Sequence, residues 1–203
     1  MESAQEWFER VSATVSADGY RAAPWQEWPT WPFTPDGAVR DLARPVEERP
    51  REGAGGAGCH QCRLRDDPSY IFWHDDLAML GEPFEATSLP LTAFLMPRRH
   101  ADLSDLTDAE AARMGQLLTV VERAVCDVLD VPRMQVYRYG DGVEHLHWWL
   151  LARPTGVAQL RGSFLPLWDD LLPTRDAAAR RHEMDAVAAR LVALAGGTAT
   201  PAP

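Results

Sequence analysis

The chain has 203 residues, of which 46% are hydrophobic and 25% are charged, proportions that are ordinary for a soluble globular protein. This length suits one domain with a substantial core and an extension. The formal net charge of −10 argues against binding to nucleic acid polymers or to anionic membranes, although one locally basic pocket could still hold a nucleotide.

Nothing in the sequence predicts a membrane location. No stretch approaches the roughly 20 consecutive apolar residues of a membrane span, and residues 2–6 are too acidic to begin a secretory signal. We therefore expect a cytoplasmic protein. In that reducing compartment, the C-x-x-C motif of Cys59 and Cys62 indicates a metal or redox site rather than a structural disulfide. Cys126 is expected to be a small buried residue of a helix.

Residues 1–58 differ in composition from the rest and are expected to form an N-terminal extension and linker. A helix is predicted over about residues 2–15. Residues 24–33 hold three tryptophans among prolines, which disfavour regular structure. Because exposed tryptophans are costly, we expect this segment to pack on the core or on a second subunit. Residues 44–58 are rich in glycine and predict a flexible linker.

Residues 59–154 show the pattern of a compact α+β domain. Strands are expected at residues 70–73, 77–80, 91–96, 134–139 and 145–151, the first two as a hairpin and the last two facing each other. Thr107 and Glu110 form a capping box that opens a long helix. The remaining residues, 155–203, are expected to form a C-terminal helical extension whose main helix spans about residues 176–195.

Four side chains suggest a metal site. His145 and His147 are two apart in an apolar run, so on a strand they would share one face. Cys59 and Cys62 offer two thiolates from one tight turn, and zinc favours tetrahedral sites of cysteine and histidine. With His100 and His145 as the second pair, the sequence predicts a zinc site. Two alternatives stay open, because the cysteines could be free thiols or a redox pair, and His60 or His74 could be a ligand instead.

If His145 turns toward the metal, His147 remains beside it as a candidate nucleophile. A neutral imidazole that is held at one nitrogen by a backbone carbonyl can attack phosphorus with the other. Nearby cations would then stabilise the phosphoryl oxygens, and the arginines close to the motif are Arg98, Arg99, Arg138 and Arg153. The competing interpretation is that His147 is a hydrogen-bonded histidine of the core.

These motifs resemble the histidine-triad (HIT) superfamily, whose signature is His-φ-His-φ-His-φ-φ. The run from His145 to Leu151 and the Arg153 that follows are similar to its signature strand. The Pro97-Arg98-Arg99-His100 segment resembles the family's Pro-Lys-x-His, and the C-x-x-C matches its zinc-binding branch. The resemblance implies an α+β fold with an antiparallel half-barrel sheet, often dimeric. It also implies that His147 is nucleotidylated and that Cys59, Cys62, His100 and His145 hold a structural zinc.

The sequence departs from the family at the third histidine position, which is Trp149. An indole offers one N–H donor but cannot transfer a proton. The loop before the motif is short, and Glu82 lies near the position of the acidic residue that holds the ribose in the family. Trp149, Arg153 and Glu82 are therefore the expected substrate-binding residues.

Three functional hypotheses follow. In the first, the protein is a nucleotidyl hydrolase or transferase that acts on a nucleotide phosphoramidate, phosphoanhydride or related phosphoester. In the second, it is a non-catalytic module that binds a nucleotide or small metabolite and carries a structural zinc. In the third, the tryptophan-rich N-terminus docks a partner enzyme. The expected ligand is a small nucleotide-like molecule, and a homodimer is possible in each case.

Overall fold

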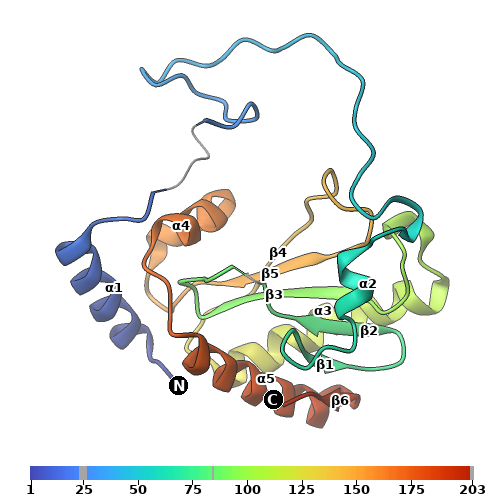
Figure 1. Cartoon of the computed structure of the whole chain (residues 1–203). Helices are drawn as coiled ribbons and strands as arrows, with labels where there is room; N and C mark the ends of the chain where they lie inside the picture. The colour runs from blue at the N-terminus through green and yellow to red at the C-terminus, as the bar shows by residue number, and fades with distance from the viewer. Residues whose placement is uncertain (23–26, 84, 202–203) are drawn as a thin grey trace.

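A six-stranded sheet lies at the centre of the computed structural model, which describes residues 1–22, 27–83 and 85–201 (Figure 1). The strand order is β4-β5-β3-β2-β1-β6, and every neighbouring pair is antiparallel. The strands are β1 (Ile71–His74), β2 (Ala78–Gly81), β3 (Leu91–Pro97), β4 (Gln135–Tyr137), β5 (Trp148–Ala152) and β6 (Thr198–Ala199). With its helices, this sheet confirms the predicted α+β class.

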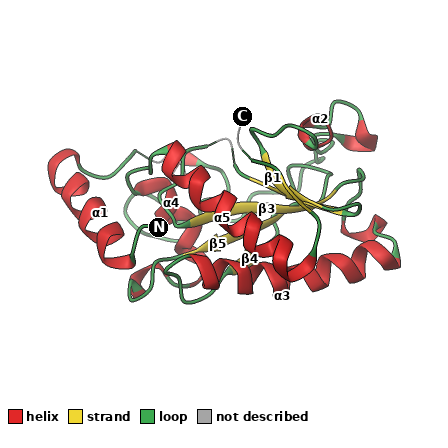
Figure 2. Cartoon of the chain, turned by 90° about the horizontal axis from the view of Figure 1, so that it is seen from below, coloured by secondary structure: helices red, strands yellow, loops and turns green. Residues whose placement is uncertain are grey.

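Two long helices cover one face of the sheet, as Figure 2 shows. They are α3 (Asp108–Val128), which opens with the predicted capping box, and α5 (Ala177–Ala195), which Asp176 caps. Both helices are amphipathic enough to bury one side against alternate strand residues. The shared core includes Leu80, Leu95 and Leu150 from the strands and Met114, Leu117, Val187 and Leu191 from the helices. Cys126, expected to be buried, is instead exposed on α3.

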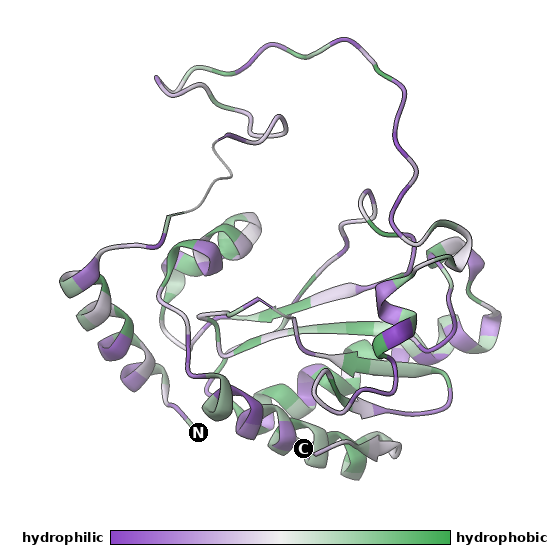
Figure 3. Ribbon diagram, in the orientation of Figure 1, coloured by the Kyte–Doolittle hydropathy of each residue, from purple (hydrophilic) through white to green (hydrophobic). Residues whose placement is uncertain are grey.

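The opposite face of the sheet carries a second set of apolar residues. Side chains alternate along β3, so Phe94 and Met96 face away from α3 and pack with Ile71 and Met79. Figure 3 shows this strongly hydrophobic character along the central strands. At one end, α1 (Ala4–Asp18) and α4 (Leu165–Leu171) pack together through a cluster that includes Trp7, Leu89, Leu151 and Leu165.

The C-terminal region contributes α5 to the core and a strand to the sheet. After α5, β6 pairs with β1, so that Trp73 lies opposite Ala199. The turn before β6 requires Gly197, because its φ is +79° and a Cβ there would lie 2.6 Å from the Trp73 ring. No helix in the described part of the chain is long and apolar enough to span a membrane.

The strand predicted over residues 145–151 begins later than expected. β5 starts at Trp148, and His145 lies in a bend before it. The Leu146 N–H donates to the Ala101 carbonyl at 2.9 Å instead of joining a ladder with β4. The expectation that His145 and His147 share the face of a strand is therefore wrong, and a side-chain interaction of His145 described below explains the difference.

The described part of the tryptophan-rich segment, residues 27–33, does not enter the core of this chain. Trp25 lies outside the described residues. Trp28 is 49% exposed, and Trp31 contacts Phe33 edge-on at a ring-centroid distance of 5.8 Å. Figure 1 shows the following stretch arching away from the sheet, and Leu42 within it is 99% exposed. Residues 44–50 of the predicted linker lack regular structure. The prediction is wrong for its second half, because Glu52 forms a bridge with Val143 and Ala54–Gly56 form a 3-10 turn.

Candidate functional site

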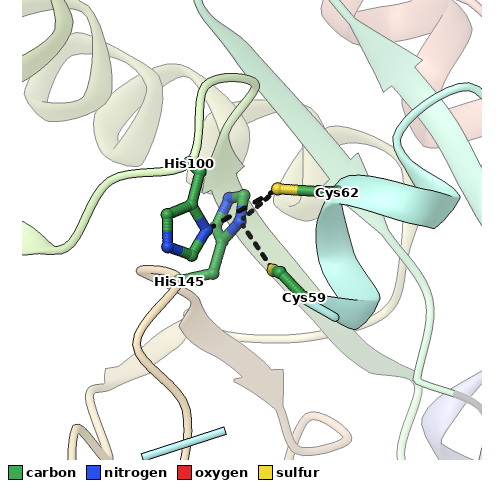
Figure 4. A group of neighbouring side chains, drawn as sticks. All are labelled: Cys59, Cys62, His100 and His145. Carbon is green, nitrogen blue, oxygen red and sulfur yellow. Dashed lines mark hydrogen bonds between the residues drawn. The ribbon is translucent and has the colours of Figure 1, made fainter. Parts of the chain in front are cut away.

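The four predicted zinc ligands meet at one edge of the sheet (Figure 4). Cys59 precedes the short helix α2 (His60–Leu64), which contains Cys62, while His100 follows β3 and His145 precedes β5. One potential ligand atom from each side chain lies within 4.8 Å of all the others. The Cys59 and Cys62 sulfurs are each 3.5 Å from Nδ1 of His145, and the Cys62 sulfur is 3.6 Å from Nδ1 of His100.

These separations fit zinc. Tetrahedral coordination with bonds of about 2.1–2.3 Å places neighbouring ligand atoms about 3.4–3.8 Å apart. Two cysteines and two histidines are also a preferred donor set for this metal. All four positions are filled by protein side chains, which is the arrangement of structural sites rather than catalytic ones. The cluster is therefore a structural zinc site, as predicted, and His60 and His74 are not part of it.

Hydrogen bonds outside the cluster orient its ligands. Nε2 of His145 lies 2.9 Å from the Pro97 carbonyl, which can only accept, so Nε2 carries the proton and Nδ1 is free for the metal. Such outer contacts fix the tautomer of a ligand. Glu144 lies 3.6 Å from Nε2 of His100 and accepts from the Gly55 N–H at 2.8 Å. This carboxylate therefore joins the glycine-rich turn to the zinc site instead of facing a substrate.

Burial changes the protonation of two residues of the cluster. Burial, and then the neighbouring Cys59 sulfur, raise the pKa of Cys62 to about 11. Without a cation, this thiol therefore keeps its proton at neutral pH, and a bound metal would displace it. Burial lowers the pKa of His145, which keeps its ring neutral as a ligand must be.

His147 lies two residues after the zinc ligand His145 and contacts its backbone. Its Nδ1 lies 2.8 Å from the carbonyl oxygen of His145, which can only accept a hydrogen bond. Nδ1 therefore carries the proton, and Nε2 keeps a free lone pair. The ring is half-buried and contacts Phe94 and Trp149 edge-on, at centroid distances of 5.9 and 6.4 Å. A residue that binds zinc through its side chain therefore orients His147 through its backbone.

Trp149, which is expected at the third histidine position, lies next to His147. Its ring packs edge-on against Phe94 at a centroid distance of 4.5 Å and against Tyr139 at 6.0 Å. Its indole nitrogen is buried, and no hydrogen-bond partner is found for it among the described residues. A buried donor without an acceptor is costly, so an acceptor on a ligand would stabilise this position.

Three of the four arginines near the motif are engaged with carboxylates. Arg98 pairs with Asp66, and Arg99 donates to Glu110 at 2.8 Å. Arg138 donates to Asp102 at 2.8 Å. A phosphate at His147 would therefore compete with these ion pairs.

Two predicted substrate-binding residues lie in other surroundings. Glu82 is buried and accepts from Nε of Arg180 at 2.8 Å, so its carboxylate is held by α5. Arg153 follows the end of β5 and donates to the Pro154 carbonyl at 3.0 Å. It lies six positions after His147, which at the rise of an extended strand is about 20 Å. Among the described contacts, neither Glu82 nor Arg153 touches His147.

No sequence pattern predicts the role of Arg51. This residue belongs to the predicted linker, yet it pairs with both Asp102 and Glu144, the latter at 3.8 Å. Together with Arg138, it lowers the pKa of Asp102 to about 2 against the opposing effect of burial. Charges in a glycine-rich stretch carry no periodicity, so only the folded chain reveals this partner.

Comparisons with known proteins identify the fold. No family model matches the chain, and no curated protein matches it either. Among solved structures, a hypothetical histidine triad nucleotide-binding protein from Sulfolobus tokodaii is 14% identical, with a TM-score of 0.52 over 68% of this chain and 97% of that one. A zinc-bound histidine triad family protein from Mycobacterium smegmatis is 20% identical, with a TM-score of 0.49 over 67% and 94%.

The Sulfolobus likeness shows that about two thirds of this chain has the histidine triad fold. It extends over nearly all of that smaller protein, so about a third of the present chain is additional to the shared fold. At such low identity the likeness establishes the architecture alone, and the chemistry of the site has to be argued from the residues of this chain.

Proposed function

We propose that this protein is a nucleotidyl hydrolase or transferase that acts through a covalent phosphohistidine at His147. The observation that carries the proposal is the contact between Nδ1 of His147 and the His145 carbonyl at 2.8 Å. This contact selects the tautomer whose Nε2 can attack. Zinc, bound by four ligands, would hold His145 in place and supply rigidity rather than chemistry at the phosphorus.

In the proposed reaction, the Nε2 lone pair of His147 attacks the phosphorus of a nucleoside monophosphoryl group. The new P–N bond forms as the bond to the leaving group breaks, and the leaving group departs with the electron pair. Water or another acceptor then attacks the phosphorus, and Nε2 recovers its lone pair. Splitting one substitution into two in this way is the advantage of a covalent intermediate.

The chemistry of Trp149 limits the class of substrate that we propose. Its indole N–H can donate to a phosphoryl oxygen, but it has no proton to transfer to a leaving group. An amine that leaves from a phosphoramidate needs such a proton, whereas the phosphate that leaves from a phosphoanhydride does not. We therefore favour a nucleotide phosphoanhydride over a phosphoramidate as the substrate.

The test is intact-protein mass spectrometry of the zinc-loaded chain after brief mixing with dinucleoside polyphosphates, nucleotide sugars and nucleoside phosphoramidates. We expect a mass gain of one nucleoside monophosphate on the wild type and none on His147→Ala. His182→Ala is the matched control, because His182 is exposed on α5 and plays no part in the site. An adduct or undiminished turnover with His147→Ala would refute the phosphohistidine.

The ion pairs around the site favour a second candidate, a module that binds nucleotides without turnover. Arg98, Arg99 and Arg138 each face a carboxylate, which leaves less positive charge to stabilise a transition state. Saturable nucleotide binding by calorimetry, with neither adduct nor product after prolonged incubation, would support this candidate over the enzyme.

A further inference from the structure

A cavity of about 450 Å³ opens beyond Trp149 and does not include His147 among its described lining residues. It lies between β5, the loop at residues 85–87 and α4, the helix that Figure 1 shows beside the sheet. Its volume falls within the range of small-molecule sites, about 300–1,000 Å³. Neither the zinc ligands nor the proposed nucleophile accounts for this space.

Aromatic side chains from three distant segments reach the cavity. Trp28 comes from the N-terminal segment, Tyr139 from the chain after β4, and Trp149 from β5. Tyr139 also stacks on Tyr137, with nearly parallel rings 6.0 Å apart. Aromatic rings therefore form part of the cavity wall, and the π faces of such rings attract cations.

The charges at the cavity have one sign. Glu85, Asp169 and Asp170 line it, and no lysine, arginine or histidine does so among the described residues. Asp169 is satisfied by the Thr87 hydroxyl and the Ser88 N–H, each at 2.6 Å. Glu85 and Asp170 are exposed at its rim, and no ion pair is recorded for either one in the described part of the chain.

Asp170 lies near two other carboxylates and one arginine. Burial, then Asp169 and then Glu85 raise its pKa, and the charge of Arg21 only partly opposes them. Arg21 itself reaches the backbone carbonyls of Asp169 and Leu172 at 3.4 Å. A cationic ligand would relieve this repulsion, whereas a phosphate would add to it.

We infer that this cavity is a binding site for a small organic cation, an alkylammonium or quaternary ammonium group. Its π faces would contact the apolar and charged surface of the cation, and the carboxylates of Glu85 and Asp170 would balance the charge. The inference does not depend on the chemistry at His147, because His147 is not among the described residues that line the cavity, although Trp149 borders both places.

Binding is tested on the zinc-loaded full chain with two matched pairs of probes. Choline is compared with its neutral isostere 3,3-dimethylbutan-1-ol, and butylammonium with butan-1-ol. The readout is the shift of the Trp28 and Trp149 indole N–H resonances during titration, assigned with single Trp→Phe variants. We expect each cation to bind at least about tenfold more tightly than its neutral partner, a difference that corresponds to about 1.4 kcal/mol.

Variants at the rim test the charge directly. Asp170→Asn and Glu85→Gln should each weaken choline binding about threefold to tenfold, because each removes one carboxylate from the rim. Both residues are exposed, so these variants should fold normally. Asp76→Asn makes the same charge change at an exposed turn outside the cavity and should leave the affinity unchanged.

Three outcomes would overturn the inference. The first is equal affinity for a cation and its neutral partner, and the second is no indole shift up to about 10 mM of either cation. The third is wild-type affinity in both rim variants. Adenosine is included as a neutral aromatic ligand, and adenosine binding without cation binding would also reject the cation site.

Discussion

The zinc corner and the cavity lie near the same sheet face, but they differ in how their charges are balanced. The zinc corner consists of the four metal ligands and the ion pairs around them, and Arg51, Arg99 and Arg138 each face a carboxylate there. In the cavity, Glu85 and Asp170 share the wall with aromatic residues, and the charge of Glu85 raises the pKa of Asp170. Charged side chains that have an ion-pair partner in the protein indicate a structural role, whereas charged side chains without such a partner indicate a ligand-binding role.

Breaking the zinc corner should produce the largest effect. Cys59→Ser removes one of the four ligands, and we expect a loss of about 4 kcal/mol, the stabilisation that a ligand supplies at about 1,000 times its dissociation constant. For a chain of this length, that loss lowers the melting temperature by about 10 °C. Differential scanning calorimetry measures it directly, and chelation of the wild type should give a similar decrease.

The matched control for this change is Cys126→Ser, because Cys126 is exposed on α3 and lies outside the cluster. It should melt within about 1–2 °C of the wild type, as surface substitutions usually do. Equal melting temperatures for Cys59→Ser and Cys126→Ser would remove zinc from the stability of this protein.

An ion pair beside the zinc corner should produce an intermediate effect with a defined pH dependence. Glu110 accepts from Arg99 at 2.8 and 3.0 Å and from the Thr107 N–H at 2.8 Å. The Arg99 hydrogen bond and Thr107 lower its pKa from 4.5 to about 2, and burial opposes them only partly. Because the folded-state pKa is depressed, the stabilisation is complete above pH 4.5 and is lost as the pH falls toward 2.

Glu110→Gln should therefore lose about 2 kcal/mol at pH 7, a value reduced to allow for solvent around the half-exposed Arg99. The difference from the wild type should shrink between pH 4.5 and 2, as urea unfolding at several pH values would show. Glu122→Gln, which removes the same charge from the same helix, controls for helix and net-charge effects. A difference that stays constant down to pH 2 would contradict this account.

The zinc corner was predictable from sequence and the cavity was not, for a physical reason. Cysteine and histidine are rare and chemically distinctive, so Cys59, Cys62, His100 and His145 identify a zinc site before their positions are known. The later start of β5, at Trp148, was not predicted, because it goes with a hydrogen bond from the His145 ring to the Pro97 carbonyl. This contact joins residues that are far apart in the sequence.

The cavity residues, by contrast, belong to common types that occur on most protein surfaces. Trp28, Tyr139 and Asp170 come from three segments that only the tertiary fold brings together. No spacing rule connects them, and an exposed aspartate at the end of a helix has no meaning by itself. Their significance depends on the missing counter-charge, which is a property of the assembled cavity.

The smallest predicted effect is an increase in the free energy of unfolding, and it distinguishes Asp170 from the adjacent Asp169. Asp170→Asn should raise the free energy of unfolding at pH 7 by about 0.3–0.5 kcal/mol, because it removes a charge that Asp169 and Glu85 repel. Asp169→Asn should instead cost about 1–2 kcal/mol, since it disturbs the hydrogen bonds from Thr87 and Ser88. Both are measured by urea unfolding without ligand. If Asp170→Asn were as destabilising as Asp169→Asn, Asp170 would be a satisfied structural group, and the contrast between the cavity and the zinc corner would not hold.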